Sequence, residues 1–159
     1  MTRLRRVLAV VLIAAAVLGV FTVPARAATE IVMTFSVNRT TSGPAMYDMR
    51  VFVVVPMNRV DAEGYLWNNA RIEVRIYGDD SGSNDPVIYG PKIYWRINGL
   101  VATDFGVVLD LYWQEPPGSW MNEDDSWTNR VDEIYARATW VDGDGGTLQA
   151  TSGVITGIF

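Results

Sequence analysis

The residues best suited to bind a ligand lie in one stretch, PPGSWMNEDDSW, at 116–127. It combines two tryptophans with four consecutive acceptor side chains. Indole faces stack on sugar rings, and neighbouring amides and carboxylates orient hydroxyl groups. Tryptophan and tyrosine also anchor protein–protein contacts inside a polar rim. Segment 114–128 is therefore a candidate site for a carbohydrate, another polymer or a protein partner, and its candidate ligand-binding residues are Tyr112, Trp113, Trp120, Asn122 and Trp127.

The same segment has a structural alternative. A long loop at the end of a β-sandwich folds a tryptophan back over the open core and leaves its acidic residues in water. Under this lid hypothesis Trp120 and Trp127 stabilise the fold and contact no ligand. Substitution of either residue would then lower stability and leave binding unchanged.

Calcium is a second candidate ligand, because Ca²⁺ takes six to eight oxygen atoms from carboxylates, carbonyls and water. No stretch has a complete calcium-loop pattern, since 142–147 opens as Asp-x-Asp-Gly but lacks the later glutamate. Aspartate and glycine are also ordinary turn residues. A calcium-stabilised structural or adhesion domain is thus an alternative function, and its candidate metal ligands are Asp79, Asp80, Asp85, Glu123, Asp124, Asp125, Asp142 and Asp144.

A carboxylate pair is the third candidate, since glycoside hydrolases use two carboxyl groups about 5.5 or 6.5–9.5 Å apart. Asp110 lies between Leu109 and Leu111 in a strand pattern, and Glu115 follows it before the tryptophan-rich segment. Alternation places Asp110 on the face opposite these leucines. That face is expected to meet solvent, so hydrolysis is the least favoured of the three functions.

The absence of two residue types limits catalysis. The chain has no histidine and no cysteine. This removes serine–histidine and cysteine–histidine catalysis, thiolate nucleophiles and the usual zinc, copper, haem and iron–sulfur ligands. Lys92 is the one lysine, and its position in a strand favours a solvated amine. We expect a binding protein that is not an enzyme.

The N-terminus is typical of an export signal. Three arginines precede an apolar run from Val7 to Val20, and Pro24-Ala25-Arg26-Ala27 predicts cleavage after Ala27. We expect 1–27 to be a cleavable signal-peptide helix and 28–159 to be a secreted domain. The alternative, an uncleaved membrane anchor, is disfavoured because the run is short for a span.

Removal of 1–27 would change the charge balance. Four of the 13 basic residues and none of the 18 acidic ones lie in 1–27, so 28–159 carries 9 basic and 18 acidic residues, a formal charge of −9. Nucleic acids and anionic membrane surfaces attract basic patches, so neither is an expected partner, and we expect the domain not to be embedded in a membrane. With no disulfides, the domain depends on its core, and its 132 residues are enough to form one.

Hydrophobic alternation with a period of two dominates this domain and predicts seven strands. Turn residues separate them, and 59–67 is only an ambiguous single helical turn. Short strands without helices predict an all-β, antiparallel sandwich, immunoglobulin-like or C2-like, with a closed β-barrel as the alternative. The predicted strands are Ile31–Val37, Met49–Val55, Ala70–Ile76, Ile93–Ile97, Phe105–Trp113, Ile134–Trp140 and Leu148–Val154.

Overall fold

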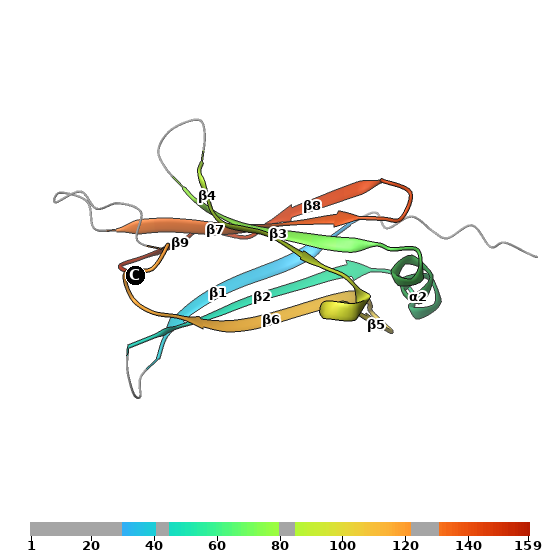
Figure 1. Ribbon diagram of the computed structural model, residues 1–159, viewed down its shortest axis with the longest axis horizontal. Coiled ribbons are helices and arrows are strands. Elements are labelled where there is room, and N and C mark those ends of the chain that lie inside the picture. Colours follow the sequence, from blue (N-terminus) through green and yellow to red (C-terminus); the bar gives the residue numbers. More distant parts are fainter. Residues whose placement is uncertain (1–29, 41–44, 80–84, 122–130) are drawn as a thin grey trace, which may run out of the picture.

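The computed structural model describes residues 30–40, 45–79, 85–121 and 131–159, and they form two antiparallel sheets packed face to face (Figure 1). The predicted all-β sandwich is therefore confirmed. The closed barrel is wrong, because the strand pairing among the described residues leaves each sheet with two open edges. The expected signal peptide and residues 122–128 of the tryptophan-rich segment lie outside the described residues.

Sheet A has the strand order β1-β2-β6-β5, and sheet B has the order β4-β3-β7-β8, with β9 also paired to β7. Six of the seven predicted strands correspond to observed ones, while β5 and β9 were not predicted. The strands are β1 Val32–Arg39, β2 Tyr47–Pro56, β3 Arg71–Gly78, β4 Val87–Tyr94, β5 Val101–Thr103, β6 Gly106–Glu115, β7 Asp132–Val141, β8 Thr147–Thr151 and β9 Ile155–Gly157.

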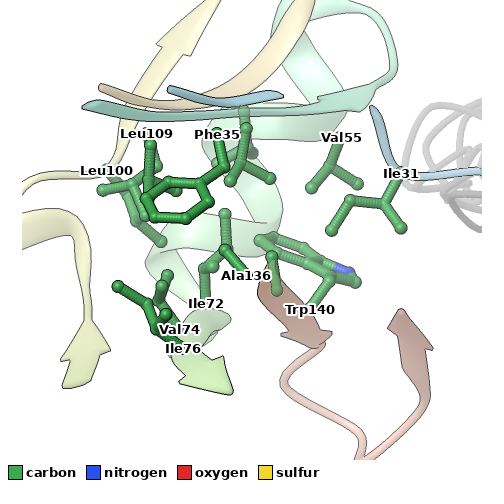
Figure 2. Packing of buried hydrophobic residues seen from close by; sticks show 14 of the residues in the cluster. Ile31, Phe35, Val55, Ile72, Val74, Ile76, Leu100, Leu109, Ala136 and Trp140 are labelled. Carbon is green, nitrogen blue, oxygen red and sulfur yellow. The ribbon is translucent and has the colours of Figure 1, made fainter. Parts of the chain in front are cut away.

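The core forms between the inward faces of the two sheets (Figure 2). Alternation predicted these faces correctly in β2, β3 and β7, where the inward side chains are buried. Burial of one such side chain contributes about 1.5–3 kcal/mol, which explains how the domain folds without disulfides. Fully buried members of this core include Met49, Val51, Val53, Val55, Ile72, Ile76, Leu109 and Ile134.

One α-helix, α2 (Arg59–Trp67), lies at one end of the sandwich (Figure 1), where the sequence indicated only an ambiguous turn. Its N-cap is Asn58, whose Oδ1 accepts a hydrogen bond of 2.9 Å from the backbone N–H of Asp61. Ala62 and Leu66, one turn apart, anchor the helix in the core. Within the described residues, no helix has the length and apolarity that a membrane span requires.

The predicted strand Ile93–Ile97 shares only Ile93 and Tyr94 with β4, which begins at Val87, and it is wrong at its C-terminal end. β4 stops at Tyr94, and a short 3₁₀ helix, η1 (Arg96–Asn98), follows. The Asn98 side chain accepts a hydrogen bond from the Trp95 backbone N–H and donates one of 3.1 Å to the Ile93 carbonyl. These local bonds close a turn in place of the strand ladder. As a result Ile97 is exposed rather than buried.

Candidate functional site

The outer face of sheet A carries a polar array across three neighbouring strands. Register places Ser36 of β1, Arg50 of β2 and Tyr112 of β6 side by side. The next row towards the end of the sheet opposite α2 is formed by Asn38, Asp48 and Gln114 in the same strand order, and the row on the other side is formed by Thr34, Phe52 and Asp110. Because side chains alternate along each strand, all nine residues face away from the core.

Arg50 and Asp110 form a bidentate ion pair at the centre of this array. The Arg50 Nε and Nη2 atoms donate hydrogen bonds of 2.8 Å to the two carboxylate oxygens of Asp110. These bonds lower the pKa of Asp110 below its usual value. The guanidinium also lies 5.8 Å from the centre of the Phe52 ring. Two planar groups are thereby held in one orientation.

A second network orients Tyr112. Its hydroxyl donates a hydrogen bond of 2.6 Å to Asp48 Oδ1, and Gln114 Nε2 donates one of 2.8 Å to the same oxygen. The bond from Tyr112, followed by that from Gln114, lowers the pKa of Asp48, while acceptance by Asp48 raises the pKa of Tyr112. Asp48 is therefore ionised at neutral pH, and its position is fixed by two donors.

These side chains surround a shallow hollow of about 510 Å³, lined by Ser36, Asn38, Asp48, Arg50, Asp110 and Tyr112. The Tyr112 residue is 62% exposed and presents an aromatic surface beside the polar groups. Two of the five Arg50 N–H donors are used by Asp110, so three remain for a ligand. The hollow offers donors, acceptors and an aromatic ring on a rigid sheet.

The tryptophan-rich segment is only partly described. Trp120 and Trp113 both stack on Tyr89 of β4. The ring centre of Tyr89 lies 4.9 Å from that of Trp120 and 5.7 Å from that of Trp113. The following residue, Met121, is fully buried. This packing agrees with the lid hypothesis for Trp120. Trp127 and Asn122 lie outside the described residues.

The calcium candidates that are described do not come together. Asp85 accepts a hydrogen bond of 2.7 Å from Tyr135, and Asp142 Oδ1 accepts bonds from the backbone N–H groups of Asp144 and Gly146. Asp142 thus closes its own turn. Among the described residues no three acidic side chains form a group suited to a metal ion. The candidates outside these residues are Asp80, Glu123, Asp124 and Asp125, and Asp79 directly follows β3, which ends at Gly78.

The two carboxylates considered for hydrolysis lie on opposite faces of β6. Asp110 is exposed on the outer face, whereas Glu115 is on the inner face, where it accepts a hydrogen bond of 3.0 Å from Trp113 Nε1. They do not face one another across a common cleft, as the two carboxyl groups of a glycosidase do. Asp110 instead belongs to the polar array.

Sequence reasoning missed most of this array. The sequence indicates Tyr112 as a candidate and predicts the outward direction of Asp110 correctly, but it does not single out Asp48 and Arg50. Their signal was present, because both alternate with buried residues of β2. What the sequence lacks is the strand order β1-β2-β6, which joins residues 60 or more positions apart.

No known protein family and no curated protein matches the chain. Among solved structures, a target of the Northeast Structural Genomics Consortium, SoR45, is similar over 80% of this chain and 83% of its own chain. The identity is 8% and the TM-score is 0.38. A likeness of this size bears on neither the fold nor the function.

Proposed function

We propose that the protein is an exported, non-catalytic module that binds a neutral polysaccharide across the outer face of sheet A. The observation that carries this proposal is the hollow around Tyr112, whose polar groups are held in place by one another. Side chains that are already ordered lose little conformational entropy when a ligand binds. The N-terminal sequence supports export, and the absence of histidine and cysteine supports binding without catalysis.

The balance of groups in the hollow suits sugar hydroxyls, which both donate and accept hydrogen bonds. Asp48 and Asp110 present acceptors, and Arg50 and Asn38 present donors. The ring of Tyr112 offers a surface on which the C–H face of a sugar packs. An anionic polymer would meet two carboxylates and a single guanidinium, so a neutral chain fits better.

Affinity electrophoresis tests the proposal. The exported protein is run through native gels that contain laminarin, dextran, mannan or arabinogalactan, and we expect at least one to retard it. Tyr112→Ala should weaken this retardation about ten-fold or more, as expected for a central aromatic contact. Ile93→Ala is the matched control, because Ile93 is also exposed but lies on β4 of sheet B, away from the polar array.

Two results would overturn the proposal. If none of the four polysaccharides retards the wild-type protein, the outer face of sheet A does not bind this class of ligand. If one retards it and Tyr112→Ala and Arg50→Ala both bind as well as wild type, the binding site lies elsewhere. Both side chains are exposed, so neither substitution is expected to unfold the protein.

A further inference from the structure

Large apolar side chains are exposed together at the α2 end of the sandwich. They come from α2, from η1, from β5 and from the turn that follows β5, and their exposed fractions lie between 56% and 90%. Extended apolar surface on a protein of this kind marks an interaction site. We call this the α2-end surface, and its members are Val60, Trp67, Ile97, Val101 and Phe105.

Trp67 joins the parts of this surface that come from α2, η1 and β5. Trp67 lines two adjoining hollows of about 440 Å³ and 300 Å³, the first shared with Ile97 and the second with Val101. The guanidinium of Arg96 lies 3.6 Å from the centre of the Trp67 ring and contributes to both hollows. The turn that carries Phe105 lies near the start of α2, since Asp104 Oδ1 lies 3.9 Å from Arg59 Nη1.

Helix α2 is apolar on two sides. Ala62 and Leu66 face the core, while Val60, Gly64 and Trp67 follow one another at helical spacing on the opposite side. Apart from its chain neighbours and the backbone of α2 itself, no atom lies within 4 Å of the position of a Gly64 Cβ, so this part of the helix surface is open. The apolar side chains of Val60 and Trp67, on the side away from the core, are therefore exposed in a single copy of the chain.

We propose that a second copy of the chain covers the α2-end surface, in a symmetric dimer. Two-fold pairing is the commonest assembly, and it requires a patch that complements itself. The apolar area that the dimer can bury is the typical area of each of the five side chains multiplied by its exposed fraction. The sum is about 500 Å² per copy, or about 1,000 Å² for the pair. This reaches the size of a small specific interface, near 1,000 Å².

The charges around the patch are also self-complementary. Arg96 stacks on Trp67 and, among the described residues, takes part in no ion pair, so its N–H edge is available. Asp104, which lies 3.9 Å from Arg59, has a side chain that is 82% exposed. Glu63, which accepts a hydrogen bond of 3.0 Å from Arg59, lines the second hollow with a side chain that is 52% exposed. In a two-fold arrangement the guanidinium of each copy meets a carboxylate of the other, and a planar guanidinium binds a carboxylate well.

Such a dimer carries two copies of the polar array. A polysaccharide long enough to reach both would be held with higher avidity than by one copy, because the second contact is intramolecular. This consequence rests on the proposed function, whereas the dimer itself does not. Self-association is therefore measured without any polysaccharide.

Analytical ultracentrifugation of the exported wild-type protein tests the dimer. Over about 1–200 µM, we expect a concentration-dependent dimer, since small interfaces of this kind are of micromolar strength. Ile97→Asp and Trp67→Ala should each weaken dimerisation about ten-fold or more, and circular dichroism should confirm that both variants remain folded. Tyr112→Ala, on the outer face of sheet A, is the matched control and should dimerise as wild type does.

Ionic strength gives an independent readout. Salt screens both the net negative charge, which opposes association of two copies, and the guanidinium–carboxylate pairs, which favour it, while apolar contact is not weakened by salt. Dimerisation should therefore persist or strengthen as sodium chloride is raised. A wild-type protein that stays monomeric over the whole concentration range would overturn the proposal. So would a dimer that neither Ile97→Asp nor Trp67→Ala weakens.

Discussion

Replacement of Trp120 by alanine tests whether this tryptophan covers the core or binds a ligand. In the structure Trp120 is half-buried, packs on the core and stacks on Tyr89. Its ring nitrogen is buried and has no hydrogen-bond partner among the described residues. The indole therefore contributes through packing, and its removal should act on stability.

The expected loss follows from this burial. Removal of a fully buried tryptophan costs about 3–5 kcal/mol, so a half-buried one should cost about 2 kcal/mol. Part of this is the stacking with Tyr89, since an aromatic pair contributes about 0.5–1.5 kcal/mol. For a domain of this size, 2 kcal/mol lowers the melting temperature by about 6–10 °C.

Urea unfolding followed by far-ultraviolet circular dichroism measures this loss directly. The urea midpoint should fall while the slope stays unchanged, because the unfolded chain is the same size. Polysaccharide retardation should persist in Trp120→Ala at a temperature where the variant is folded. A loss of stability below about 0.5 kcal/mol, typical of an exposed site, would refute the lid assignment. Loss of retardation in the folded variant would place Trp120 in the binding site instead.

Two further predictions concern α2 and the polar array. Gly64→Ala should stabilise the monomer by about 0.5–1 kcal/mol in thermal unfolding, because alanine favours a helix and the space around Gly64 is open. Gly106→Ala should destabilise the protein, because the added Cβ would lie 2.1 Å from the Val55 carbonyl oxygen. Tyr112→Phe should raise the pKa of Asp48 towards its usual value of about 3.9 in an NMR carboxyl titration, because the hydroxyl bond that lowers it is lost. An unchanged or lower pKa, or a destabilised Gly64→Ala, would contradict these assignments.

The inner faces of β2, β3 and β7 were predictable because alternation is a local property. Met49, Val51 and Val53 occupy every second position, and the period of a strand sends them to one side. Trp140 was assigned to the core on the same grounds and is buried. For these inner faces, the sequence of a single strand is sufficient to make the prediction.

Two local elements were missed although their signals are in the sequence. Asn58 with Asp61 three residues later is a helix-start pattern, but Gly64 weakened the case for α2. Asn98 redirects the chain after Tyr94 by bonding to backbone groups, so the apolar alternation of Ile93, Trp95 and Ile97 did not continue as a strand. At η1, short-range hydrogen bonds outweighed the hydrophobic period.

The sequence by itself determined the class of fold, the faces of the long strands and a side-chain set without thiols or imidazoles. Tertiary structure alone decided which residues from different elements come together on one surface. The order β1-β2-β6 brings Arg50 to Asp110 and Asp48 to Tyr112, and the packing of α2 beside η1 brings Trp67 to Arg96. The physical reason is that strand pairing depends on backbone hydrogen bonds, which any two strands offer, and the choice of partner comes from burial of the whole core.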